Sequence, residues 1–385
     1  MKRILSIFLL VPFLSLGQNF RLSDQAEISI ITCGPFQGEL YSAFGHSSFR
    51  VYDPQNGYDA AYNYGVFSFN QPNFYLNFAR GYLYYQLGVY DYPSFEEYYV
   101  AADRYVHEQV LNLTQAQKQK MFDYLQWNSL PQNRHYRYDY FYDNCATKMR
   151  DVVAHVLGED IRFDGSYITT DYTIRELTDI YLKEQPWGDL GIDICLGLPM
   201  DKKATPAEYM FLPDYVESAF DNAFIRRNGE EVPAVKTKNL IHDSRDQVAT
   251  KRVYTPLIVF SCFLLVAIFV TYRDLRRKSI SKWFDVILFG VTGLIGVLLF
   301  FLWFLTDHNA AARNLNILWA LPLHLVAVMA FLRNPAWLKY YFGVVAVLSL
   351  ILLITWFGLP QKLHYALIPI VISQGLRAFT EYRLR

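Results

Sequence analysis

Five apolar segments after Thr255 constrain the fold of this chain more than any other feature. They lie at about residues 256–272, 284–305, 317–332, 340–359 and 363–379, each close to the ~20 residues that a helix needs to cross a bilayer. The third and fifth segments carry the weaker signal. The sequence therefore predicts an all-α transmembrane bundle of about five helices over residues 251–385.

The charges between the segments predict how this bundle is oriented. Arg273, Arg276, Arg277 and Lys278 follow the first segment, and cytoplasmic loops carry an excess of such basic residues. This loop should therefore be cytoplasmic, which places residues 18–255 on the periplasmic side and makes residues 306–316 an outer loop. The chain is predicted to be a multi-pass protein of the inner (cytoplasmic) membrane.

The N-terminus has the layout of a secretory signal peptide over residues 1–17. Two basic residues, Lys2 and Arg3, precede a short apolar stretch that ends near Ser15 and Gly17, a segment too short to span a bilayer. Residues 18–250 carry 32 Asp and Glu against 20 Lys and Arg. This acidic balance lacks the basic surface that binds nucleic acid, so no nucleic-acid partner is expected.

The exported part reads as mixed α and β structure. Short strands are expected at residues 28–32, 46–52, 62–69, 82–90 and 105–111, with helices opening on capping boxes at Ser94 and Thr114. A further helix begins at Asp143 or Asn144 as N-cap and carries an apolar stripe from Met149 to Leu157. Cys145 then lies at the positive end of this helix.

A cysteine in this position can carry chemistry. A helix N-terminus and a nearby histidine both lower the pKa of a thiol, and the thiolate is the nucleophile. His46 opens a predicted strand, and among the exported histidines it is our choice as the base. The exported part also contains Cys33 and Cys195, so a structural disulfide that includes Cys145 is an equally good interpretation of the composition.

Several ordered motifs together resemble one family, the Lnb lipoprotein N-acyltransferases. They are residues 32–35 (TCGP), 41–50 (YSAFGHSSFR), 62–67 (YNYGVF) and 143–151 (DNCATKMRD), followed in the membrane half by 306–308 (TDH) and 314–319 (NLNILW). The resemblance covers residues 28–185 and extends into the membrane half. It implies an exported α+β domain of the permuted papain-like, NlpC/P60-like kind at 18–185, ahead of the bundle, with 186–250 as an extension or linker.

The resemblance also implies a reaction and its residues. Cys145 is the nucleophile, His46 the base and Asn63 the third group, with Tyr62 or Tyr64 as alternatives. Substrate contacts are expected from residues of the same motifs and of the outer loop: Tyr41, Ser42, Tyr62, Tyr64, Asn144, Asp307, His308 and Asn316. The acyl donor would be a membrane phospholipid and the acceptor a diacylated lipoprotein, with no metal or organic cofactor.

Two other functions remain open at this point. A cell-wall thiol amidase or peptidase would use the same cysteine and histidine. A non-catalytic membrane sensor or scaffold would use Cys145 only in packing or in a disulfide.

Overall fold

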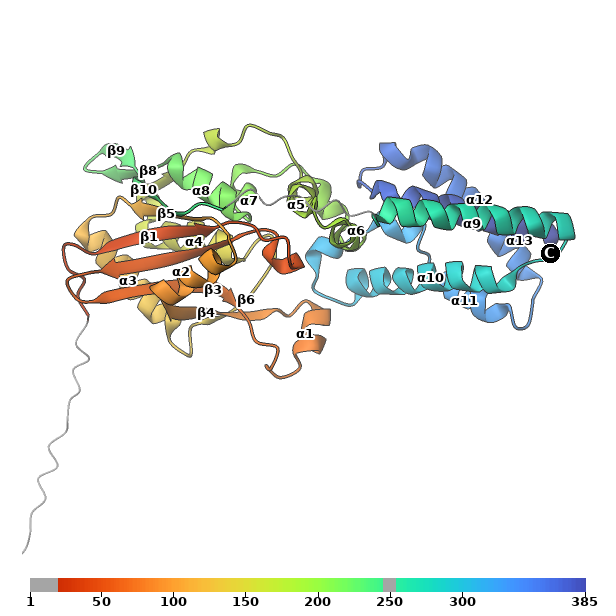
Figure 1. Ribbon diagram of the computed structural model, residues 1–385, viewed down its shortest axis with the longest axis horizontal. Helices are drawn as coiled ribbons and strands as arrows, with labels where there is room; N and C mark the ends of the chain where they lie inside the picture. The colour runs from red at the N-terminus through yellow and green to blue at the C-terminus, as the bar shows by residue number, and fades with distance from the viewer. Residues whose placement is uncertain (1–19, 245–253) are drawn as a thin grey trace, which may run out of the picture.

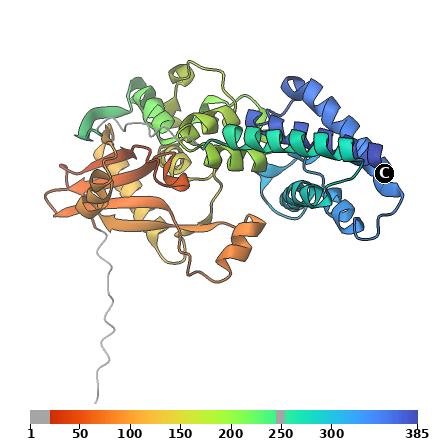
Figure 2. The same ribbon diagram turned by 45° about the vertical axis from the view of Figure 1, so that its right-hand side comes forward.

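The computed structural model describes residues 20–244 and 254–385, so the predicted signal peptide lies outside the described residues. An α+β domain and a helical bundle lie end to end along the long axis of the molecule (Figure 1), and the turned view keeps the two parts separate (Figure 2). The exported domain comes first in the chain and the bundle last.

The exported domain is built on a seven-stranded antiparallel sheet in the order β10-β5-β1-β2-β3-β4-β6. Its strands are β1 (Glu27–Cys33), β2 (His46–Asp53), β3 (Tyr58–Val66), β4 (Tyr84–Asp91), β5 (Val106–Leu111), β6 (His135–Arg137) and β10 (Val235–His242). A smaller antiparallel sheet consists of β7 (Ile161–Phe163), β8 (Ala223–Arg227) and β9 (Glu230–Pro233).

Eight α-helices surround these sheets in the described part of the exported domain. They are α1 (Phe74–Arg80), α2 (Tyr92–Ala101), α3 (Gln115–Ser129), α4 (Cys145–Leu157), α5 (Ile174–Leu182), α6 (Pro186–Cys195), α7 (Pro206–Tyr209) and α8 (Pro213–Asp221). The predicted capping box of Thr114 with Gln117 is confirmed at α3. The one at Ser94 is wrong, because the Asp91 carboxylate accepts the Ser94 N–H and starts α2 at Tyr92.

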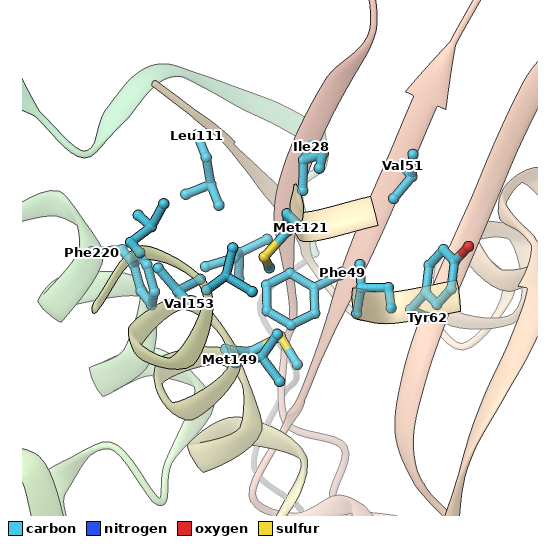
Figure 3. Packing of buried hydrophobic residues seen from close by; sticks show 14 of the residues in the cluster. Ile28, Phe49, Val51, Tyr62, Leu111, Met121, Met149, Val153 and Phe220 are labelled. Atoms are coloured by element: carbon cyan, nitrogen blue, oxygen red, sulfur yellow. The ribbon is translucent and has the colours of Figure 1, made fainter. Parts of the chain in front are cut away.

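Helix α4 supplies the main packing partner of the sheet. Met149 and Val153 point from this helix toward Phe49 of β2 (Figure 3), and all three side chains are buried. These positions recur at helical spacing, so one face of α4 is apolar. Burying each such side chain contributes about 1.5–3 kcal/mol, which fixes the helix, and with it Cys145, against the strands.

Residues 186–244 belong to the folded domain and are not a linker, which corrects the predicted boundary at 185. Strand β10 pairs with β5 at the edge of the large sheet, so the sheet is incomplete without it. Helix α8 contributes Val216 and Phe220 to the same core as α4. The remainder of the predicted 186–250 segment, from residue 245, lies outside the described residues.

The bundle contains five α-helices among residues 254–385: α9 (Pro256–Arg277), α10 (Lys282–Phe304), α11 (Leu323–Ala330), α12 (Trp337–Thr355) and α13 (Ile368–Leu384). Three helical stretches, α9, α10 and Trp337–Gly358, are long and apolar enough to cross a membrane. The third predicted segment is divided between a 3-10 turn at Leu315–Leu318 and the short α11.

The fifth segment carries a weak hydropathy signal because α13 buries polar groups. Its Arg377 guanidinium lies fully buried between the carboxylates of Asp285, at 2.7 Å, and Asp274, at 2.9 Å. These acids come from α10 and α9, so the ion pairs connect three helices of the bundle. A buried charge is stable only when it is paired in this way.

Candidate functional site

Cys145 is the first residue of α4, at the end of the helix that carries partial positive charge. The Asn144 side chain caps the helix by accepting the backbone N–H groups of Ala146 and Thr147, both at 2.9 Å, and the Thr147 hydroxyl accepts the Asn144 N–H at 2.8 Å. This reciprocal cap fixes where the helix starts. The predicted N-cap and the predicted position of the cysteine are therefore both confirmed.

His46 opens β2, as predicted, and lies between Cys145 and Asn63. Its Nε2 donates to the Asn63 side-chain oxygen at 2.7 Å, and its ring is close enough to the Cys145 thiol for each group to shift the pKa of the other. All three side chains remain partly exposed, so a substrate group can reach this cysteine–histidine–asparagine triad.

The triad changes the ionisation of its members. Burial opposes the charged form of Cys145, but the His46 charge, its hydrogen bond and the backbone N–H groups of Ser47 and Ala146 outweigh it, so the thiol pKa is lowered. Burial likewise opposes protonation of His46, yet the adjacent thiolate and the hydrogen bonds to Cys145 and Asn63 raise its pKa. The two shifts together favour a thiolate–imidazolium pair, the reactive form of a thiol enzyme.

Close packing holds the triad on both sides. The His46 ring stacks on Tyr99 of α2, with ring centroids 6.0 Å apart and planes within 9°. On the other side, Gly65 has φ of +90°, and an added Cβ would lie 3.6 Å from both the Cys145 Cβ and the Tyr138 ring. No sequence signal indicated Tyr99 and Tyr138, since strand alternation and capping patterns do not report contacts between distant segments.

The other exported cysteines differ from Cys145. Cys33, Cys145 and Cys195 are all free thiols in the structure, so it contains no disulfide that includes Cys145. Burial raises the pKa of the Cys33 and Cys195 thiols, which disfavours their thiolates. Cys145 is the exported cysteine with a lowered pKa.

Strand β2, which starts at His46, begins at the end of the sheet that faces the bundle (Figure 1). Leu40, in the 3-10 turn Leu40–Ser42 between β1 and β2, packs against Gly188 of α6. Helix α6 in turn contacts the membrane half, because the Asn314 amide donates to the Ile194 carbonyl at 2.8 Å and the Gln361 amide to the Leu196 carbonyl at 3.0 Å. The turn that precedes His46 is therefore connected, through α6, to the membrane half of the chain.

Comparison with protein families gives two matches that together span most of the chain. Residues 19–179 match the model of the Lnb N-terminal periplasmic domain, and residues 248–385 match that of the Lnb transmembrane domain, a five-helix unit. The chain belongs to the Lnb family. Its N-terminal domain is periplasmic and its C-terminal helices form the transmembrane domain. Comparisons with curated proteins and with solved structures found no match.

In this Lnb protein, four of the predicted substrate residues lie near His46 or Asn63 in the sequence but differ in exposure. Tyr41 is exposed, whereas the Ser42 hydroxyl is buried and donates to the Phe36 and Glu39 carbonyls. Tyr62 and Tyr64 alternate with Asn63, so they point to the opposite face of the sheet and into the α4 core.

The hydroxyls of these two buried tyrosines have partners within the core. Tyr62 bonds Tyr58 at 2.7 Å, and Tyr64 donates to Asn128 at 2.6 Å. The structure thus uses Ser42, Tyr62, Tyr64 and the N-cap Asn144 for folding. Among these residues, Tyr41 is the one whose side chain is free for a substrate.

The predicted outer-loop residues separate into two groups. Asp307 and His308 contact the exported domain: Arg137 donates to the Asp307 carboxylate at 2.6 Å, and the His308 Nε2–H donates to the Phe78 carbonyl at 3.0 Å. Asn316 is buried, and its amide donates to the Asp193 and Ile194 carbonyls of α6 and accepts from Trp319. Asn316 therefore joins the two domains and does not line the site, a correction that follows from its complete hydrogen bonding.

Proposed function

We propose that this protein is a lipoprotein N-acyltransferase that moves an acyl chain from a membrane phospholipid to the α-amine of a diacylglyceryl-cysteine lipoprotein. One observation carries the proposal: Cys145, His46 and Asn63 lie together in a periplasmic domain that is hydrogen-bonded to a transmembrane bundle. A histidine that precedes the cysteine, with the cysteine at a helix start and the histidine on a strand, also suits a permuted papain-like enzyme.

The first half-reaction would transfer the acyl group to the enzyme. The Cys145 thiolate attacks the ester carbonyl of the phospholipid, and backbone N–H groups at the start of α4 stabilise the oxyanion. The carbon–oxygen ester bond then breaks, and the His46 imidazolium gives its proton to the leaving lysophospholipid oxygen. The product is a thioester on Cys145, with His46 neutral.

The second half-reaction would transfer the acyl group to the lipoprotein. The free α-amine attacks the thioester carbonyl, neutral His46 accepts a proton from the amine, and a carbon–nitrogen bond replaces the carbon–sulfur bond. This step restores the thiolate–imidazolium pair. Asn63 would keep the imidazole in the orientation that both steps need, because it bonds the ring at Nε2.

The membrane location supports transfer over hydrolysis. Donor and acceptor are both anchored in the bilayer, so an enzyme held at the same surface meets them at high effective concentration. A peptidase or amidase whose cell-wall substrate lies outside the bilayer gains no comparable advantage from the bundle.

Mass spectrometry of a lipoprotein N-terminus tests the proposal in cells that lack other N-acyltransferases. Cells with the wild-type protein should carry an additional acyl chain on the α-amine, and cells with Cys145→Ala or His46→Ala should not. Cys195→Ala is the matched control and should retain activity, since burial raises the pKa of that thiol. A free amine in cells with folded wild-type protein, or full acylation by Cys145→Ala, would remove the assignment.

A further inference from the structure

The connection between β3 and β4 is an exposed, aromatic arm that the proposed triad does not use. This α1 arm consists of residues 67–83 and contains the helix α1. Phe69, Tyr75, Leu76 and Phe78 all expose large apolar side chains, with Tyr75 77% exposed. The arm has no Asp or Glu in a domain rich in both, and its charged residue is Arg80.

Contacts with the bundle fix the height of the arm relative to the membrane. The Asp307 N–H donates to the Arg80 carbonyl at 2.9 Å, and His308 donates to the Phe78 carbonyl at 3.0 Å. Gly81, with φ of +80°, allows the close approach, because a Cβ there would lie 3.0 Å from the backbone of Asp307 and His308. These partners follow directly after Phe304, where the membrane helix α10 ends.

The outer end of α10 has the character of a membrane interface. Phe300, Phe304 and Leu305 are exposed there, close to Trp303, and aromatic residues are enriched where spans leave the hydrocarbon. Figures 1 and 2 both show α1 extending from the sheet toward the bundle. The apolar face of α1 is therefore at the depth where short amphipathic helices insert into a leaflet.

A continuous aromatic stack leads from this arm to the thiol. Phe74 of α1 stacks on Phe67 with ring centroids 6.1 Å apart, Phe67 on Tyr85 at 5.0 Å, and Tyr85 on Tyr138 at 4.3 Å. Tyr138 in turn lies beside Gly65, which borders Cys145. Phe74 and Tyr85 are buried and Phe67 and Tyr138 are half-buried, so the stack joins the arm to the wall of the triad as one packed apolar unit.

We infer that α1 seats in the outer leaflet and that the arm forms the access route by which a membrane phospholipid presents its ester to Cys145. The occupant of the apolar face is the acyl region of the bilayer. The seating of the arm stands on the contacts above, whereas the donor route rests on the proposed acyltransferase function.

Photo-crosslinking of the full-length wild-type protein tests the seating. The protein is placed in phospholipid nanodiscs that contain phosphatidylethanolamine with a diazirine on its acyl chain, irradiated and digested. We expect lipid adducts on the tryptic peptide of residues 51–80, which contains α1, as well as on the bundle. Adducts on α9–α13 without any on this peptide would overturn the inference.

Substitution of the exposed face tests the donor route. The triple variant Tyr75→Ser, Leu76→Ser, Phe78→Ser should lose the arm adducts and acylate Cys145 from bilayer phospholipid about tenfold or more slowly, since three apolar contacts with the leaflet are lost. Its Cys145 should still react with water-soluble iodoacetamide at the wild-type rate. The matched control, Trp127→Ser with Leu130→Ser, removes exposed apolar groups at the end of α3 and should retain both rates.

The outcomes separate this inference from the proposed function. Arm adducts combined with no Cys145 acylation by wild-type protein would support the seating but overturn the donor route and the acyltransferase assignment. Normal N-acylation by the triple variant would overturn the donor route and leave the assignment intact.

Discussion

Replacing His46 with alanine measures how strongly the imidazolium stabilises the Cys145 thiolate. Two unit charges about 4 Å apart at an effective dielectric constant of about 20 attract each other by about 4 kcal/mol. One pKa unit corresponds to about 1.4 kcal/mol, so losing this attraction should raise the thiol pKa by about 3 units. Burial of Cys145 continues to oppose ionisation in the variant, which therefore titrates above an ordinary cysteine.

The rate of alkylation should fall by less than the thiolate fraction. A thiolate of higher pKa is intrinsically more nucleophilic, with a Brønsted coefficient of about 0.4–0.5. This effect recovers about 1.2 to 1.5 of the three powers of ten, so at a pH below both pKa values the rate should fall about 30- to 60-fold. The direction follows from the lowered pKa of Cys145: wild-type reactivity appears at a lower pH than that of an ordinary thiol.

Iodoacetamide alkylation between pH 5 and 10 provides the assay, with the Cys145 peptide quantified by mass spectrometry in full-length protein. Wild-type protein should reach half of its maximal rate well below the pH that the His46→Ala variant requires. His135→Ala is the matched control, because His135 is an exposed residue of β6. Equal midpoints for wild type and His46→Ala would refute the ion-pair reasoning.

Three further substitutions have expected outcomes. Asn63→Ala should reduce lipoprotein N-acylation by about 10- to 100-fold through loss of imidazole orientation, measured in the mass-spectrometric assay, and an unchanged rate would contradict the role of Asn63. Asn144→Ala should destabilise the domain by about 1–2 kcal/mol and should also slow Cys145 alkylation, measured by thermal unfolding and by the alkylation assay. The control is Thr114→Ala, which removes an equivalent cap from α3 and should reduce stability without slowing alkylation. Arg175→Ala leaves the buried Asp193 and Asp201 without their partner and should cost about 3–5 kcal/mol. Its melting temperature is compared with that of Arg162→Ala, which breaks an exposed pair with Glu231 and should change little.

Local signals in the sequence predicted the parts of the site that local structure determines. Asn144 and Thr147 form a cap within four residues of chain, so the start of α4 and the position of Cys145 follow from the sequence around them. His46 and Asn63 lie on adjacent strands of a hairpin. The resemblance of their motifs and the short turn between the strands were enough to predict that the two side chains lie close together.

The sequence did not predict the features that depend on contacts between distant segments. Strand β10 has mostly exposed side chains without apolar alternation, so its pairing with β5 has no periodic signal. Arg175 is fully buried because two aspartates from later segments surround it. Asn316 lies in a polar stretch that is typical of a solvated loop, and its burial depends on hydrogen bonds to carbonyls of α6.

The arrangement of the triad bears on how a thiol enzyme can favour an amine over water. A thioester in open solution meets water at a far higher concentration than any lipoprotein amine, so an acyltransferase must gain its selectivity from position. Holding two groups in the reactive geometry provides effective concentrations of about 10⁵–10⁸ M in favourable cases. In this protein, α6 and the α1 arm attach the exported domain to the outer end of the bundle, where the proposed membrane-anchored substrates would present their ester and amine groups. The rigid attachment of the exported domain, and not the triad alone, is therefore what would distinguish transfer from hydrolysis.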